Sequence, residues 1–182
     1  GDAPAEEPAE EEDTTQVPAE RIEGQLVNPA SSGRMWSEEV PGLLTFRGNP
    51  TRTYYGRGDV PTAPKVKWFT PDDGGMCSSS AKGITKTWCG MGWTGQPAVF
   101  ERDGRTWVVY GAYDGAVHFK DGATGEDILP PFQTDDIIKG SVTVDPDGFP
   151  IVYSGSRDNY YRAIAIDRPG EAVELWKLSA EA

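Results

Sequence analysis

Hydrophobic and polar positions alternate along the second half of the chain in short runs that end at glycine and aspartate turns. A period of two residues is typical of β-strands, and the runs lack the 3.6-residue period of an amphipathic helix. Asp103-Gly104 and Asp147-Gly148 favour tight hairpins between neighbouring runs. The pattern predicts two groups of four antiparallel strands, at 97–101, 106–110, 116–120 and 128–132, and at 140–144, 150–154, 161–166 and 173–178.

The two groups of strands repeat similar residues at the same turns. Asp103-Gly104 lies 44 positions before Asp147-Gly148, and Asp114-Gly115 lies 44 positions before Asp158-Asn159. A period of this length is typical of propellers, in which each four-stranded sheet is one blade around a central axis. An antiparallel sandwich also uses short strands and frequent turns, but its strands have no reason to recur in groups of four. We therefore predict an all-β fold that contains part of a β-propeller.

The first half of the chain contains two segments of different character. Residues 1–41 form an acidic leader rich in Pro and Glu, whose first 24 positions hold nine carboxylates against Arg21 alone, a net charge of −8 out of −12. So few apolar side chains cannot offset the entropy of ordering, so we expect a mostly disordered spacer or partner-binding arm. Residues 42–94 form a lead-in segment with one expected strand at 65–70. The two predicted blades then occupy 95–134 and 135–182.

Two cysteines, Cys77 and Cys89, lie in a stretch rich in Gly, Ser and Thr. A structural zinc site needs four donors in a tetrahedral array, and this stretch offers no histidine and no further cysteine. A disulfide is the simpler interpretation, and closing the loop 77–89 stabilises a fold by about 3 kcal/mol on the chain-entropy argument. Because disulfides persist in oxidising compartments, we predict an extracellular or periplasmic protein.

The charge balance and the hydropathy of the chain argue against two classes of partner. With 17 Lys and Arg against 29 Asp and Glu, the sequence has no basic stripe that would displace counterions from nucleic-acid phosphates. It also has no apolar run of the roughly 20 residues that a membrane-spanning helix needs. We predict neither nucleic-acid binding nor a membrane span.

The sequence offers few residues for catalysis or metal binding. His118 is the only histidine, and a general acid or base needs a positioned partner and a pocket that a lone His does not specify, so strand packing or surface exposure is the simpler interpretation. Asp145 and Asp147 precede Gly148, but the run lacks the third acidic ligand and the distant Glu of an EF-hand loop, and it suits a hairpin turn. We predict no catalytic residue, no metal site and no cofactor.

Several loop residues are expected to share one surface. In a propeller, the turns between second and third strands emerge on the same face as the links between blades, and such loops carry specificity while the sheets stay rigid. The candidate binding face comprises one aromatic residue, two cations, four carboxylates and one amide: Tyr113, Asp114, Asp135, Asp136, Lys139, Arg157, Asp158 and Asn159. Alternatively, Asp158 and its equivalents cap turns. Arg157 replaces Tyr113 in the repeat, so the turn does not dictate its side chain.

The motif FRGNPTRTYYG (46–56), followed by PKVKWFT (64–70) and YGAYDGAVHFKDGATGE (110–126), resembles the pyrroloquinoline-quinone-like repeat propellers. This superfamily contains quinoprotein alcohol dehydrogenases and outer-membrane assembly propeller lipoproteins. The resemblance implies a ring of sheets in which strand 65–70 completes the last blade as its outermost strand. Because two blades cannot close a ring, we expect the remaining blades from a second polypeptide or from a missing C-terminal part.

The resemblance implies less about chemistry than about fold. Cofactor-using members of the family hold the quinone with a calcium ion and often have a disulfide between adjacent cysteines. Cys77 and Cys89 are not adjacent, and the calcium ligands of the family match no motif here.

Three functions follow from these patterns, in order of preference. The leading hypothesis is an exported, non-catalytic propeller segment that acts as a binding or scaffolding module. The first alternative is part of a quinone-dependent dehydrogenase whose catalytic residues lie outside this chain, with pyrroloquinoline quinone and calcium as cofactors. The second alternative is a carbohydrate-binding propeller in which Trp88 and Trp93 form a stacking platform.

Overall fold

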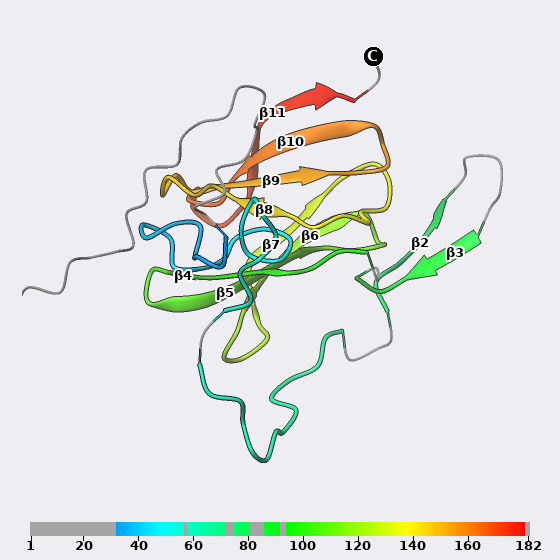
Figure 1. Ribbon diagram of the computed structural model, residues 1–182. Coiled ribbons are helices and arrows are strands. Elements are labelled where there is room, and N and C mark those ends of the chain that lie inside the picture. The colour runs from blue at the N-terminus through cyan, green and yellow to red at the C-terminus, as the bar shows by residue number, and fades with distance from the viewer. Residues whose placement is uncertain (1–31, 57, 72–74, 81–85, 92–93, 181–182) are drawn as a thin grey trace, which may run out of the picture.

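The structure is a computed structural model that describes residues 32–56, 58–71, 75–80, 86–91 and 94–180. The described part of the chain consists of antiparallel strands, turns and loops, with no helix (Figure 1). The all-β prediction is therefore confirmed. The disorder predicted for the leader falls largely on residues 1–31, which lie outside the described residues.

The first large sheet is the predicted first group of strands. Its meander comprises β4 (Ala98–Arg102), β5 (Arg105–Gly111), β6 (Ala116–Asp121) and β7 (Asp127–Gln133). A short strand, β1 (Gly42–Leu43), pairs with β4 and gives the order β1-β4-β5-β6-β7. Gly42 is needed there because a Cβ would clash with the carbonyl oxygen of Val99. The positive φ angles of Asp103 (52°) and Gly104 (70°) fit the tight hairpin predicted between β4 and β5.

The second large sheet is the predicted second group of strands. It comprises β8 (Thr143–Val144), β9 (Ile151–Gly155), β10 (Tyr160–Ala165) and β11 (Val173–Ser179), in the order β11-β10-β9-β8. Strand β8 is shorter than the predicted run 140–144. The residues just before β8 contact the segment that precedes β4, since Thr94 Oγ1 donates to the carbonyl oxygen of Lys139 and the backbone N–H of Gln96 donates to Ser141 Oγ.

A third, two-stranded sheet is formed by β2 (Cys77–Ser80) and β3 (Lys86–Cys89), which extends away from the two larger sheets in Figure 1. Cys77 and Cys89 lie directly opposite each other at its base and form the predicted disulfide.

The predicted strand at 65–70 is wrong for this structure. These six residues, all described, belong to none of the sheets, and their one clear anchor is the Trp68 Nε1–H, which donates to the carbonyl oxygen of Gly122 at 3.0 Å. Val66 and Phe69 are exposed. A strand forms only beside an edge that pairs with it, and no described strand pairs with this segment.

One hydrophobic core joins the two large sheets. The first sheet contributes Phe100, Trp107, Val109, Val117, Phe119 and Leu129, and the second contributes Val144, Val152 and Ile164. Val40 and Leu44 of the lead-in segment belong to the same cluster, and the carbonyl oxygen of Leu44 accepts a hydrogen bond from the Val144 N–H. Residues 42–44 therefore connect β4 of one sheet to β8 of the other.

Each sheet has two faces, which the repeat makes comparable. Face A contains Val109 and Phe119 in the first sheet, and 44 positions later Tyr153 and Ala163 in the second; both pairs lie directly opposite each other on neighbouring strands. Face B contains the residues that alternate with these.

The two sheets pack on each other through unlike faces. The first sheet buries face A, through side chains such as Val109 and Phe119, whereas the second buries face B, through Val152 and Ile164. The sheets are thus stacked head to tail, with face A of one against face B of the next.

Candidate functional site

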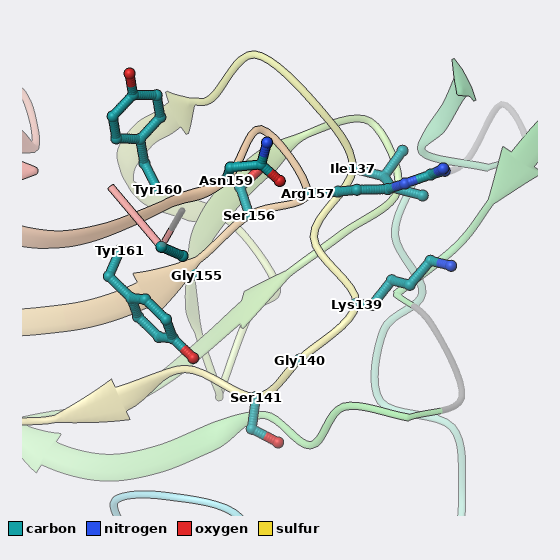
Figure 2. A pocket seen from close by; sticks show the side chains of 11 residues that line it. Ile137, Lys139, Gly140, Ser141, Gly155, Ser156, Arg157, Asn159, Tyr160 and Tyr161 are labelled. Atoms are coloured by element: carbon teal, nitrogen blue, oxygen red, sulfur yellow. The ribbon is translucent and has the colours of Figure 1, made fainter. Parts of the chain in front are cut away.

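A cavity of about 410 Å³ lies where the link between the two large sheets meets the β9–β10 turn (Figure 2). Three residues of the predicted binding face, Lys139, Arg157 and Asn159, line it. The remaining lining residues are Ile137, Gly140, Ser141, Gly155, Ser156, Tyr160, Tyr161 and Ala180. Among these described lining residues there are two cationic side chains and no carboxylate, although the chain as a whole carries a net charge of −12. The cavity is therefore lined by two cationic side chains on an acidic protein.

The turn that carries Arg157 is held by backbone hydrogen bonds. The N–H of Ser156 donates to the carbonyl oxygen of Tyr160, and the N–H of Asn159 donates to that of Ser156. Asn159 has a φ of 71°, a conformation that asparagine tolerates well. The N–H of Arg157 donates to the carbonyl oxygen of Ile137, which ties the turn to the link between the sheets. Figure 2 shows the side chains of Arg157 and Lys139 extending in the same direction.

Lys139 also contacts an aromatic group from the small sheet. Its Nζ lies 4.6 Å from the centroid of the Trp88 ring, and Lys86 Nζ lies 4.9 Å from the same ring. Trp88 in turn meets Tyr113 edge to face, at 5.7 Å between centroids. These contacts stabilise the position of Lys139 through cation–π attraction. The proposed carbohydrate platform would need Trp93, which lies outside the described residues.

Asp158, another residue of the predicted binding face, is committed to a buried ion pair. Arg162 donates to both of its carboxylate oxygens, at 3.0 and 2.6 Å, and to Glu174 Oε2 at 3.0 Å. The side chains of Asp158 and Arg162 are both buried. Desolvation raises the pKa of Asp158, but hydrogen bonds from Arg162 and from the backbone N–H groups of Asp135 and Tyr160 outweigh it, so its pKa lies below the usual range.

Asp114 occupies the equivalent position in the first sheet and plays a similar part. Its Oδ1 accepts the N–H of Ala116, and its Oδ2 lies 2.9 Å from Nε2 of His118. Burial raises the pKa of Asp114, and the hydrogen bonds from His118 and Ala116 outweigh that effect and lower it. His118 is buried on face B and stacks on Tyr110 at 5.2 Å between ring centroids. The simple interpretation of His118 as a strand-packing residue agrees with this position.

The eight predicted residues do not form one open surface. Tyr113 is buried beneath Trp88, and Asp114 and Asp158 cap the turns that follow them, as the alternative interpretation expected. The backbone N–H of Asp135 donates to Asp158, and the side chain of Asp136 accepts the N–H of Ile137. The structure therefore brings together Lys139, Arg157 and Asn159. Asp114, Asp136 and Asp158 instead accept hydrogen bonds from nearby backbone N–H groups.

Sequence analysis missed two aromatic residues of this cavity, Tyr160 and Tyr161. They are the first two residues of β10 after the turn residue Asn159, and Figure 2 shows their side chains pointing to opposite sides of the strand. The pair of consecutive aromatics after a turn was the available signal. It was not used because Tyr161 was assigned only to a strand.

The described residues supply little for a metal or a membrane. No group of three or more His, Cys, Asp or Glu side chains among them is placed to hold a metal ion. Asp145, which lies in the Asp-Pro-Asp-Gly run, accepts hydrogen bonds from the Asp147 N–H and the Tyr153 hydroxyl. In the same part of the chain there is no helix with the length and apolar character needed to span a bilayer.

The chain was compared with family models, with curated proteins and with solved structures, and it matches none of them.

Proposed function

We propose that this chain is an exported, non-catalytic β-propeller segment that acts as a binding and scaffolding module, with further four-stranded sheets completing the ring. The observation that carries the proposal is the head-to-tail stacking of the two large sheets. When face A of one repeat packs on face B of the next, the same contact can recur, as it does in heterologous rings. A sandwich of two sheets closed on each other has no such continuation. The disulfide supports the exported location.

Face A of the second sheet is the surface where a third sheet would pack. It presents Tyr161, Trp176 and Leu178, which are 60%, 49% and 66% exposed. The first sheet buries the corresponding positions against its neighbour, with Val117 and Leu129 as the equivalents of Tyr161 and Trp176. Large exposed apolar groups in one patch are typical of an interaction surface. We therefore assign this face to a four-stranded sheet with an apolar face B, from the same or another polypeptide.

The cavity beside Lys139 and Arg157 is the proposed binding site of the module. The two cationic side chains that line it favour an anionic group.

The sheet-docking part of the proposal is tested by sedimentation velocity and by binding of an apolar fluorescent dye. The chain with its Cys77–Cys89 disulfide formed is expected to self-associate with rising concentration and to bind the dye, because large apolar side chains on face A of the second sheet are exposed. The double variant Trp176→Lys with Leu178→Lys should reduce both signals. The matched control is Val60→Lys with Val66→Lys, which also replaces two exposed apolar residues but lies outside face A.

Two results would contradict the proposal. One is a stable chain that stays monomeric at every concentration and binds no dye. The other is an equal reduction of both signals by the control variant, because that would mean that face A has no special role.

A further inference from the structure

The small β2–β3 sheet brings a third cationic side chain, Lys86, toward Lys139. Lys86 and Trp88 are two residues apart on β3, so their side chains lie on the same face of that strand. This face turns toward the link between the two large sheets, because the Trp88 ring meets Tyr113 edge to face and lies 4.6 Å from Lys139 Nζ. Lys86 therefore lies on the side of the hairpin that faces Lys139.

The two lysines share one indole ring. Lys86 Nζ lies 4.9 Å from the centroid of the Trp88 ring, and Lys139 Nζ lies 4.6 Å from the same centroid. Neither lysine forms an ion pair with a carboxylate among the described residues. Like charges repel each other, and the cation–π attraction of the ring offsets that repulsion. An anionic group beside the ring would be attracted by both lysines.

Lys139 also belongs to the cavity of about 410 Å³, where Arg157 is the second cation. Figure 2 shows the side chains of Lys139 and Arg157 extending in the same direction. Arginine binds phosphate and sulfate oxygens through pairs of N–H groups, and lysine binds them as a point charge. Lys139 thus connects two parts of one site, because it lines the cavity with Arg157 and shares the indole ring with Lys86.

The disulfide holds the hairpin in place for this role. A two-stranded hairpin alone is only marginally stable, and the Cys77–Cys89 bond joins its strands at the position next to Trp88. The N–H of Tyr113 donates to the carbonyl oxygen of Gly90, which ties the end of the hairpin to the first large sheet. Lys86 is therefore held near Lys139 before a ligand arrives, which lowers the entropy cost of binding.

We propose that the ligand of this cavity carries at least two phosphate or sulfate groups, one bound by Lys139 and Arg157 and another bound by Lys86 beside Trp88. This inference rests on the proposed function, since it takes the same cavity as the anion site and adds the hairpin to it. Lys86 is then the residue that distinguishes a polyanion from a single anion.

Calorimetric titrations at low ionic strength test the role of Lys86. Inorganic phosphate and tripolyphosphate form one pair of probes, and inorganic sulfate and a trisulfated disaccharide form the other. In the pair that matches the ligand, Lys86→Gln should weaken the multiply charged probe about fivefold and leave the single anion nearly unchanged. Lys139→Gln should weaken both members of that pair about fivefold. The pair that responds in this way identifies the group as phosphate or sulfate.

Arg168→Gln is the matched control, because it also removes one positive charge. Arg168 lies between β10 and β11, beyond the end of β10 that is opposite to Arg157. It should affect each probe less than Lys86→Gln affects the multiply charged one. Lys86 is exposed, so Lys86→Gln should keep the wild-type melting temperature. The indole N–H signal of Trp88, identified as the one missing from Trp88→Phe, should shift when the multiply charged probe is added.

The possible failures are distinguishable. If no probe bound, both the anion site of the proposed function and this inference would be overturned. If phosphate or sulfate bound in a way that depends on Lys139 and Arg157, but Lys86→Gln and Arg168→Gln had equal effects on the multiply charged probes, this inference alone would be wrong. A Trp88 indole signal that stayed in place while those probes bound would contradict it as well.

Discussion

The two large sheets are built from the same 44-residue repeat, but the first buries Val117 and Leu129 on face A whereas the second exposes Tyr161, Trp176 and Leu178 there. Leu129 lies opposite Phe119 in the first sheet, and Trp176 lies opposite Ala163, the residue 44 positions later, in the second. Leu129 is 7% exposed and Trp176 is 49% exposed. The repeat thus specifies strands and turns equally in both sheets, and the difference between the two positions comes from the neighbour that packs on one of them.

The turn acids of the two sheets differ in a similar way. Asp114 pairs with His118, which is charged only when protonated, and its side chain remains 26% exposed. Asp158 pairs with Arg162, which is permanently charged, and both side chains are buried. Arg162 also bonds to Glu174. The same turn therefore holds a histidine–carboxylate pair in the first sheet and, in the second, a buried Asp158–Arg162 ion pair that Glu174 extends toward the surface.

The largest effect is expected from breaking the ion network of the second sheet. Asp158→Ala should lower the free energy of unfolding by about 3–5 kcal/mol, because it leaves the buried Arg162 without its bidentate partner. Asp114→Ala should cost only about 1–2 kcal/mol, because it removes hydrogen bonds to Ala116 and His118 but no bidentate ion pair. Urea unfolding of both variants measures the difference.

The double variant Asp158→Ala with Arg162→Met serves as the control for that comparison. It removes the uncompensated charge and should recover part of the lost stability. Equal costs at the two turns would show that the arginine network is not stronger than the histidine pair.

A somewhat smaller effect on stability is expected at equivalent positions that are buried in one sheet and exposed in the other. Leu129→Ala should lower the free energy of unfolding by about 3 kcal/mol, because it leaves a cavity between the sheets. Trp176→Ala should cost less than about 1 kcal/mol in the chain alone, since half of that side chain already contacts water. Thermal or urea unfolding of the two variants is the measurement.

The same pair of variants also sharpens the proposal that a third sheet docks. Once a partner sheet covers face A, the cost of Trp176→Ala should rise toward that of Leu129→Ala. A cost that stays below about 1 kcal/mol in the presence of the partner would place the partner elsewhere.

The sequence predicted the strands well because local chemistry determines them. Alternation and Asp-Gly turns located eight of the nine strands of the two large sheets, with β8 clearly shorter than expected and the short β1 missed. Residues 65–70 show the limit of this reasoning, since their alternation is strand-like but no sheet edge pairs with them. Which face of a sheet is covered depends likewise on a neighbour and not on the strand itself.

The candidate site was predicted only in part, for a related reason. Arg157, Lys139 and Asn159 were identified because turns and links were expected to meet. Nothing in the sequence marked Asp158 as different from these residues, but Arg162, four positions later, forms an ion pair with its carboxylate. Lys86 was not identified at all, because its approach to Lys139 depends on the three-dimensional position of the hairpin, which alternation does not encode.

The smallest effect concerns pH and distinguishes the two turn acids from ordinary surface acids. The pKa of Asp114 is lower in the folded protein than the roughly 3.9 of an unfolded aspartate. A lowered pKa contributes stability above the unfolded value, and that stability is lost as the pH falls through the folded value. The cost of Asp114→Asn, about 1 kcal/mol at pH 7, should therefore shrink between about pH 5 and pH 2 in urea titrations. A cost of Asp114→Asn that stayed constant down to pH 2 would mean that its carboxylate charge does not stabilise the turn.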